Sequence, residues 1–278
     1  PAQATRADPS AGAMSLALPQ AKKSLGQHFL VDNHYIQRIV AAIRPQAGDR
    51  MVEIGPGPGA LTRPLLESLG HLDVVELDRD MVARLQAEFP SGQLTIHQAD
   101  ALRFAFGDLG PDLRVVGNLP YNISSPLLFH LAEYASGIRD MCFMLQKEVV
   151  DRMAAAPGTP DYGRLSVMLQ ARFRVDKLFT VPPGAFRPPP KVDSAIARLA
   201  PLPEAAVPYR EHRVFAEVVA RAFGQRRKTL RNTLRGLVDE PLFAELGIDP
   251  ARRGETLSVA EFAALANRLP GNQDQRGG

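Results

Sequence analysis

An amide, a proline and an aromatic ring stand together in Asn118-Leu119-Pro120-Tyr121, directly after the apolar run 113–117. An adenine amine is a weak nucleophile because its lone pair is delocalised into the ring. The Asn118 oxygen and a carbonyl of Leu119 or Pro120 are suitable acceptors for its two hydrogens and would favour a pyramidal, reactive nitrogen. Tyr121 can stack on a flipped-out base. Alone, the stretch would more often be an ordinary Asx-type turn; it indicates adenine N-methylation only where it ends a strand of a cofactor-binding sheet.

A glycine loop precedes this stretch. "VEIGPGPGALT" places Gly55, Gly57 and Gly59 between an apolar run and a helical pattern, where glycine permits a tight turn and close approach to a ligand. The spacing G-x-G-x-G differs from that of dinucleotide sites, and Pro56 and Pro58 lack the N–H donors that a pyrophosphate requires. The loop therefore favours a ligand without phosphate at this point, and S-adenosylmethionine fits.

Acidic residues end the next two apolar runs. Glu76 lies 21 positions after Gly55, where a carboxylate can accept both ribose hydroxyls. Asp100 follows the third run and can accept from the exocyclic amine of the cofactor adenine. The structural alternative is a tight turn plus surface acids. For the glycine loop taken alone, this alternative is a serious competitor. It is weaker when the glycine loop, Glu76 and Asp100 each follow a predicted strand.

Apolar runs alternate with helical patterns from Arg50 to Gln146, which indicates βαβ units and a parallel sheet covered on both faces. Ligands bind at the carboxyl ends of such strands, so this fold would bring the glycine loop, Glu76, Asp100 and Asn118 to one edge. Strands are predicted at 50–54, 72–77, 94–97, 113–117 and 140–146, and helices at 59–70, 79–89, 124–135, 148–155 and 164–173.

Ser124 and Ser125, followed by Pro126, signal a helix N-cap. Two strand-like runs, 175–182 and 192–199, flank a proline-rich loop and are predicted to pair as a hairpin at the sheet edge. The proline-rich segment 200–208 is typical of a linker, and only helical patterns follow it. We therefore expect a disordered leader at 1–21, of which 1–13 is compatible with an expression remnant, and domains at 22–202 and 203–278.

The composition is that of a soluble globular protein: 278 residues, 45% hydrophobic and 23% charged. The net charge of +3 and an isoelectric point near 9.2 are compatible with a nucleic-acid partner. The single cysteine, Cys142, allows no internal disulfide, and no Cys/His cluster has metal spacing. No apolar run reaches the length of a membrane span, and no secretory signal is present. The chain is expected in the cytoplasm, with no metal and no membrane contact.

Taken together, these motifs resemble the KsgA-type ribosomal small-subunit RNA adenine dimethyltransferases. The resemblance runs from Lys22 to the C-terminal helices, through "KKSLGQHFLVD", "VEIGPGPGALT", "VVELDRD", "QADAL", "GNLPYNIS", "MLQKEVVDR", "YGRLSVM", "FRPPPKVDSAI" and "QRRKTLRN". It implies a Rossmann-like class I S-adenosylmethionine-dependent methyltransferase domain with a smaller all-helical C-terminal domain. The implied reaction puts two methyl groups on N6 of each of two adjacent adenosines in the 3′-terminal hairpin of small-subunit rRNA.

The resemblance also implies a site and partners. Its cofactor pocket would comprise His28, Leu30, Gly55, Glu76, Asp100 and Asn118. The family often has asparagine where this chain has His28. The resemblance therefore carries over a backbone contact with the cofactor at this position, but not a side-chain contact. The partner would be rRNA within a ribosomal subunit precursor, and we expect the protein to act as a monomer.

A basic segment, 221–235, contains no acid. It carries Arg221, Arg226, Arg227, Lys228, Arg231 and Arg235. As one helix it would place Arg227, Arg231 and Arg235 on one face and an apolar stripe on another, which suggests phosphate contact; the alternative is a solubilising face. Phe186, in a proline-stiffened loop, is a candidate second stacking surface for the target base; the alternative is an ordinary core or loop phenylalanine.

Three other functions are compatible with parts of the sequence. A methyltransferase acting on large-subunit rRNA or DNA would use the same catalytic turn, but "PPPKVDS" and "QRRKTLRN" favour the small-subunit family. An RNA-binding assembly factor, with methylation secondary, would use the basic segment equally well. A nicotinamide oxidoreductase is disfavoured by the prolines of the glycine loop.

Overall fold

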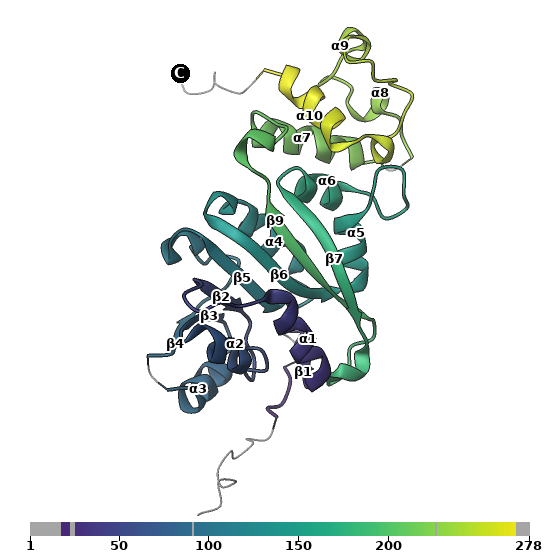
Figure 1. Ribbon diagram of the computed structural model, residues 1–278. Helices are drawn as coiled ribbons and strands as arrows, with labels where there is room; N and C mark the ends of the chain where they lie inside the picture. Colours follow the sequence, from purple (N-terminus) through teal and green to yellow (C-terminus); the bar gives the residue numbers. More distant parts are fainter. Residues whose placement is uncertain (1–17, 23–25, 91, 226, 271–278) are drawn as a thin grey trace, which may run out of the picture.

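Seven strands form the main sheet of the computed structural model, which describes residues 18–22, 26–90, 92–225 and 227–270 (Figure 1). The strand order is β4-β3-β2-β5-β6-β9-β7; the first five strands are parallel, and β9 and β7 run antiparallel to their neighbours. The bounds are β2 Met51–Ile54, β3 Leu72–Glu76, β4 Leu94–Gln98, β5 Leu113–Asn118, β6 Ile138–Gln146, β7 Phe173–Val181 and β9 Ser194–Pro201. The predicted hairpin of the last two runs is confirmed.

Helices cover both faces of the sheet, as predicted. Side chains of successive strand residues point to opposite faces, so Val115 packs in the cluster under α4, α5 and α6, and Val116 packs in the cluster under α1, α2 and α3. The bounds are α1 Asn33–Ile43, α2 Thr62–Leu69, α3 Arg79–Glu88, α4 Ser124–Ala132, α5 Lys147–Ala154 and α6 Arg164–Gln170. Helix α1 was not among the predicted elements.

The chain reverses direction across the sheet between β2 and β5. From β2 it proceeds outward through β3 and β4, and then returns to the other side of β2 as β5. Such a switch point opens a crevice at the carboxyl ends of the two central strands. The two strands approach so closely that a Cβ on Gly117 would lie 2.4 Å from the Ile54 carbonyl oxygen. The switch point therefore places the glycine loop after β2 beside Asn118 at the end of β5.

A second, two-stranded sheet was not predicted. Strand β1, Phe29–Leu30, pairs antiparallel with β8, Phe186–Arg187. This pairing joins the N-terminal segment to the loop between β7 and β9, and it holds residues 26–30 beside the sheet edge where the ligands are expected.

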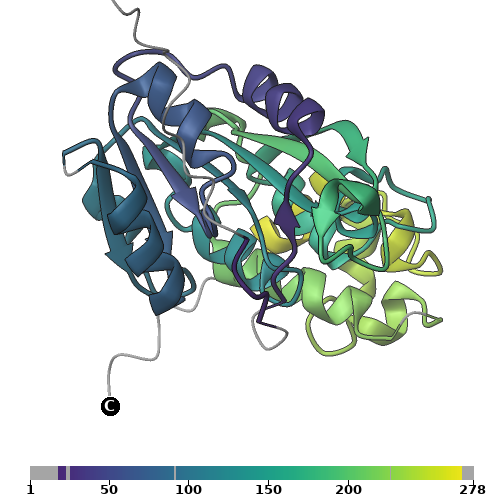
Figure 2. The same cartoon turned by 90° about the horizontal axis from the view of Figure 1, so that it is seen from below.

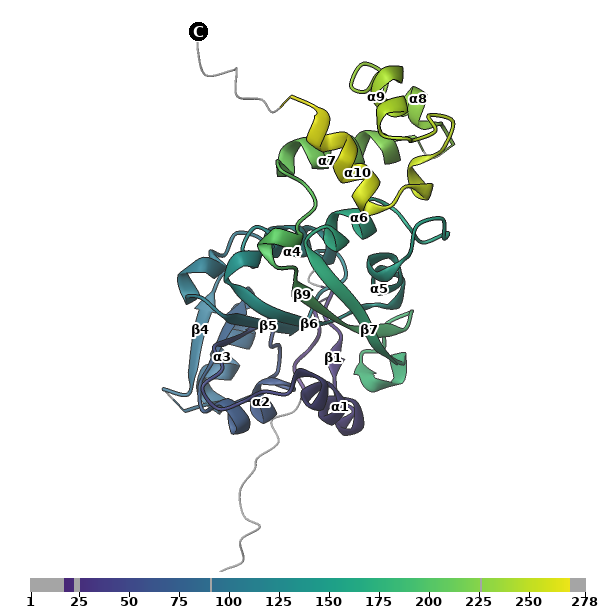
Figure 3. The same cartoon turned by 45° about the horizontal axis from the view of Figure 1, so that its top comes forward.

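The C-terminal part contains helices and loops but no strand in its described residues, 203–225 and 227–270, as predicted. Its helices are α7 His212–Phe223, α8 Leu230–Thr233, α9 Glu240–Glu245 and α10 Val259–Arg268. They share a hydrophobic cluster that includes Val167 and Met168 of α6, so this part packs against α6 (Figure 3). In the view from below, it lies at the opposite side of the molecule from the blue elements around α3 (Figure 2).

The separation of this C-terminal part at residue 203 as an independent domain stays a prediction. Residues 1–17 of the proposed leader lie outside the described part of the chain.

One continuous helix over 221–235 is wrong. Helix α7 ends at Phe223, and α8 begins only at Leu230. The first N–H groups of α8 are bound from outside the helix: Leu230 N donates to the Arg252 carbonyl and Arg231 N to the Pro250 carbonyl. The apolar residues Leu230 and Leu234 are nevertheless buried in the shared cluster.

Candidate active site

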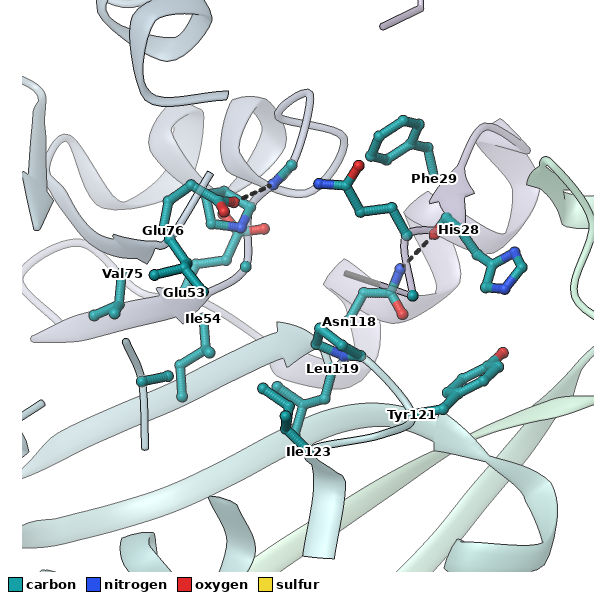
Figure 4. Close-up of a pocket in the computed structure, with 18 of the residues that line it drawn as sticks. His28, Phe29, Glu53, Ile54, Val75, Glu76, Asn118, Leu119, Tyr121 and Ile123 are labelled. Carbon is teal, nitrogen blue, oxygen red and sulfur yellow. Dashed lines mark hydrogen bonds between the residues drawn. The ribbon is translucent and has the colours of Figure 1, made fainter. Parts of the chain in front are cut away.

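A cavity of about 240 Å³ lies at the carboxyl ends of β2, β3 and β5 (Figure 4). Its walls come from the N-terminal segment 26–30, the glycine loop, the ends of β3 and β4, and the turn after β5. All the residues named for the cofactor pocket line it: His28, Leu30, Gly55, Glu76, Asp100 and Asn118. The structure thus brings together residues that are far apart in the sequence, and their role in binding the cofactor stays a proposal.

The glycine loop needs glycine for two reasons. Gly55, Gly57 and Gly59 have φ values of 65°, 52° and 87°, in the left-handed region that side chains disfavour. A Cβ on Gly57 would also approach the Phe29 ring to 3.4 Å, and one on Gly59 would approach the Phe89 ring to 3.1 Å. The loop therefore packs tightly against the N-terminal segment on one side and α3 on the other.

The segment 26–30 is anchored beside the pocket. Gln27 Nε2 donates to Asp78 Oδ2 at 3.0 Å, and Lys22 Nζ forms ion pairs of 2.6 Å with both Asp78 and Asp80. Asp78 is buried and caps the N-terminus of α3. Because these contacts tie the segment to the loop after β3, the segment closes one side of the cavity.

Glu76 is a buried acceptor at the end of β3. One carboxylate oxygen accepts from Asp78 N at 2.9 Å. The other accepts from Gly57 N at 3.3 Å (Figure 4). Burial raises the pKa of this carboxyl, and the backbone donors oppose that shift. Each oxygen has a further lone pair for a pocket ligand.

Asp100 holds a related position after β4. Its Oδ1 accepts from Leu102 N at 2.9 Å, which fixes the carboxylate at the cavity wall. Beside it Leu77, whose side chain is exposed, contributes apolar surface that suits a planar ring. A buried carboxylate for the ribose hydroxyls (Glu76), a half-buried one for the adenine amine (Asp100), apolar walls and a glycine loop whose prolines lack N–H donors fit S-adenosylmethionine. Leu77 was not among the predicted residues.

Glu53, like Leu77, lines the pocket but is not among the residues predicted from the sequence. It lies within β2, is 2% exposed and accepts from Thr62 Oγ1 at 2.6 Å. Desolvation, assisted by the nearby Glu76 charge, raises its pKa to about 7. The signal that could have found it was an acid inside the apolar run "MVEI", because charged residues are rarely buried without a purpose.

We expect Glu53 to make the folded protein less stable as pH rises. Between the unfolded pKa near 4.5 and about 7, the folded state holds a proton that the unfolded chain has lost. The free energy of unfolding should therefore fall by up to ~1.4 kcal/mol per pH unit across this window. Glu53→Gln, which stays neutral, should flatten the slope. Urea titrations at intervals from pH 5 to 8 measure it, and equal slopes in both proteins would contradict the assignment.

The turn after β5 orients the Asn118 amide. Asn118 Nδ2 donates to the His28 carbonyl at 3.1 Å (Figure 4). A carbonyl can only accept, so this bond directs the NH₂ group to His28 and leaves the side-chain oxygen as an acceptor at the pocket. The turn carbonyls differ: Pro120 O already accepts from Ile123 N at 3.2 Å and Ser124 Oγ at 3.0 Å. Among the described residues no donor is bonded to Leu119 O, which makes it the better second acceptor.

The predicted N-cap role of Ser124 and Ser125 is wrong. Helix α4 begins at Ser124 with Ile123 as its cap residue, and no side chain caps it. Ser124 is turned back to the Pro120 carbonyl instead, where it stiffens the turn.

Tyr121 stands at the end of the cavity beside Asn118 (Figure 4). Its hydroxyl lies 2.8 Å from Ser194 Oγ, and its ring packs on the His28 imidazole. Burial raises the pKa of Tyr121, so the phenol remains protonated at neutral pH. A partly exposed ring at the mouth can stack on a base.

The predicted stacking role of Phe186 is contradicted. The ring is fully buried in the cluster with Leu30, Val181 and Ile196, and Phe186 is absent from the cavity lining. Pairing of β8 with β1 turns it into the core, so it has no exposed face to offer a base.

The predicted RNA-facing residues are all exposed, apart from Arg226, which lies outside the described residues. Arg221 is paired with Glu217 at 2.7 Å and Arg231 with Glu240 at 2.6 Å, while Arg235 donates to Asn232 at 3.0 Å. Arg227 and Lys228 stand in the turn between α7 and α8, with no ion pair to any described residue. Arg227, Arg231 and Arg235 therefore do not share one helical face. Arg227 and Lys228 still form an exposed basic turn between α7 and α8.

Two negative observations hold for the described part of the chain. No helix in it is long and apolar enough to cross a membrane. No group of three His, Cys, Asp or Glu side chains in it is placed to hold a metal ion.

Comparisons with known proteins agree with this geometry. The family model "Ribosomal RNA adenine dimethylase" matches residues 19–270. "Ribosomal RNA small subunit methyltransferase A" from Aromatoleum aromaticum is 61% identical over 90% of this chain and 94% of its own length, and the protein of that name from Thiobacillus denitrificans is 62% identical over 89% and 97%.

Two solved structures share the fold. A dimethyladenosine transferase from Plasmodium falciparum matches with a TM-score of 0.74 and 26% identity over 86% of this chain and 96% of its own. The 23S rRNA methyltransferase ErmE matches with a TM-score of 0.62 and 25% identity over 87% and 99%. The chain therefore belongs to the ribosomal RNA adenine dimethylase family, and it is an enzyme that takes its methyl groups from S-adenosylmethionine.

Proposed function

We propose that the target is N6 of two adjacent adenosines in the 3′-terminal hairpin of small-subunit rRNA, each receiving two methyl groups. The observation that carries the chemistry is the Asn118 amide, whose NH₂ group is tied to the His28 carbonyl and whose oxygen is left for the pocket. The choice of small subunit rests on relatives of that name at 61–62% identity, against 25% for ErmE.

The cofactor side of the site comprises Glu76, Asp100 and the glycine loop. Glu76 would accept the ribose hydroxyls, Asp100 would accept the adenine amine, and the loop would let the ligand approach the backbone. S-adenosylmethionine supplies an electrophilic methyl group on a sulfonium. The remaining work of the protein is to exclude water and to orient the incoming amine, since positioning alone supplies much of such a rate gain.

The acceptor side comprises Asn118, Leu119 and Tyr121. The Asn118 and Leu119 oxygens would accept the two N6 hydrogens and favour the pyramidal nitrogen, while Tyr121 holds the base plane. Asn118 is neutral and removes no proton beforehand, because the methylated ammonium is acidic enough to lose its proton to water. One hydrogen remains after the first transfer, so one acceptor suffices to hold N6 for the second.

The direct test uses labelled S-adenosylmethionine and undermethylated small subunits. Nuclease mapping should place the label in the 3′-terminal hairpin, and mass spectrometry of nucleosides should find dimethyladenosine. Label found only in large-subunit rRNA, or a reaction that stops at monomethyladenosine under exhaustive conditions, would overturn the proposal.

The proposed setting is a ribosomal subunit precursor in the cytoplasm, with the enzyme acting as a monomer. An assembly role can coexist with methylation, because the basic turn and the catalytic turn are separate parts of the molecule. A catalytically inactive Asn118 variant that still binds subunits would show both roles.

We expect the basic turn to contribute to rRNA affinity through phosphate contacts. Replacing both Arg227 and Lys228 by alanine should reduce the slope of log K against log salt by roughly 0.7–0.9 per lost contact. Arg231→Ala should change the slope less, because Arg231 is already paired with Glu240. Binding to subunits at several salt concentrations measures the slopes, with exposed Arg213, at the far end of α7, as the alanine control. A double variant with the wild-type slope would refute the contact.

A further inference from the structure

Two contacts from distant parts of the chain hold the Tyr121 ring. Its hydroxyl is hydrogen-bonded to Ser194 Oγ at 2.8 Å, and Ser194 is fully buried at the start of β9. The His28 imidazole stacks on one face, with ring centroids 5.7 Å apart and planes 27° apart (Figure 4). His28 Nδ1 lies 2.9 Å from the Pro188 carbonyl, which can only accept, so Nδ1 carries the hydrogen and the imidazole is itself held in place.

The spacing of these rings decides which face of Tyr121 is usable. A base inserted between two rings needs roughly 7 Å, twice the ~3.5 Å contact distance between carbon atoms. The His28 and Tyr121 centroids are only 5.7 Å apart, so no base fits between them. With Phe186 in the core, the face of Tyr121 turned away from His28 is left for the target adenine.

His28 acts on the acceptor site in two separable ways. Its main-chain carbonyl accepts from Asn118, and its side chain packs on Tyr121. A substitution at position 28 changes the ring contact and leaves the carbonyl in place. The two contributions can therefore be told apart by mutagenesis.

We propose that His28 and Ser194 are positioning residues for base recognition: they hold Tyr121 so that the adenine stacks on one face only, in line with the Asn118 oxygen. This inference rests on the proposed stacking role of Tyr121. It assigns a function to the side chain at position 28, where the family often has asparagine. It also makes the β1–β8 pairing part of the active site, because this pairing fixes the position of His28.

The first test compares four variants in methylation of undermethylated small subunits. His28→Ala should lower kcat/KM by about threefold to tenfold, the range expected for loss of one stacked aromatic pair. His28→Phe keeps a ring and should recover most of the rate. His28→Asn keeps a donor for the Pro188 carbonyl but no ring, and it should resemble His28→Ala. His34→Ala, an exposed histidine of α1, is the matched control.

Cofactor affinity separates positioning from cofactor binding. Calorimetry with S-adenosylhomocysteine should give a Kd for His28→Ala within about twofold of wild type, because the ring contacts Tyr121. A Kd that weakens by the same factor as kcat/KM would overturn the inference. So would a His28→Phe variant as slow as His28→Ala, since the ring would then have no role.

Double variants show whether both residues act through Tyr121. In a Tyr121→Ala background, His28→Ala and Ser194→Ala should cause no further loss, and Ser194→Ala should add nothing to Tyr121→Phe. Additive losses would overturn the inference. If Tyr121→Ala itself has the wild-type rate, the proposed stacking function fails. If Tyr121→Ala is slow while the His28 and Ser194 single variants are as fast as wild type, only the present inference fails.

Discussion

Asn118→Ala should lower the rate of both methyl transfers by roughly 10²–10³, the cost typical of removing one preorganised polar group from a reacting centre. The expected loss is in kcat, because the Asn118 oxygen orients N6 and does not bind the bulk of the RNA. Removing the amide also frees the His28 carbonyl, which accepts from Asn118 Nδ2 in the wild type. Single-turnover assays with mass spectrometry of mono- and dimethyladenosine measure the two steps separately.

Two further variants sharpen this prediction. Asn118→Asp keeps an oxygen acceptor but loses the N–H to His28 and adds a negative charge, so it should also be slow. Asn33→Ala, exposed at the start of α1, controls for the loss of an amide elsewhere. Binding to subunits should remain within about twofold of wild type in all three, because the expected phosphate contacts lie elsewhere. Dimethylation by Asn118→Ala at the wild-type rate would show that the turn does not perform the chemistry.

Glu76→Ala should weaken the binding of S-adenosylmethionine by on the order of a hundredfold, or about 3 kcal/mol. The expected loss is large for two reasons. The carboxylate is the proposed acceptor for both ribose hydroxyls, and its removal also leaves the N–H groups of Gly57 and Asp78 without their partner. Glu76→Gln retains one acceptor oxygen and should lie between Ala and wild type. Calorimetric titration with the cofactor and with S-adenosylhomocysteine gives the affinities.

Asp73→Ala is the matched control for this experiment. Asp73 lies on the same strand, pairs with His97 at 2.8 Å and does not line the cavity, so its loss should leave the cofactor Kd unchanged. Circular dichroism confirms that each variant folds. A Glu76→Ala protein that is folded and binds the cofactor as tightly as wild type would exclude Glu76 from the ribose site.

The sequence by itself determined the order and type of the central elements. Strands and helices show different periodicities of apolar residues, which are local properties, so the runs that became β2 to β6 and helices α2 to α6 could be recognised without a structure. The ligand edge followed as well, because the carboxyl ends of parallel strands must meet there. Gly55, Glu76, Asp100 and Asn118 all line one cavity for this reason.

Only the tertiary structure decided the details that depend on distant partners. Strand β1 has two residues, too few for a periodicity, yet its pairing with β8 buries Phe186 and brings His28 to Tyr121. The basic segment has a helical pattern, but carbonyls of Arg252 and Pro250 take up the first N–H groups of α8, and α7 stops at Phe223. The raised pKa of Glu53 likewise comes from burial. Such contacts join residues far apart in the chain, so no local pattern records them, and the assembled fold alone fixes which side chains meet.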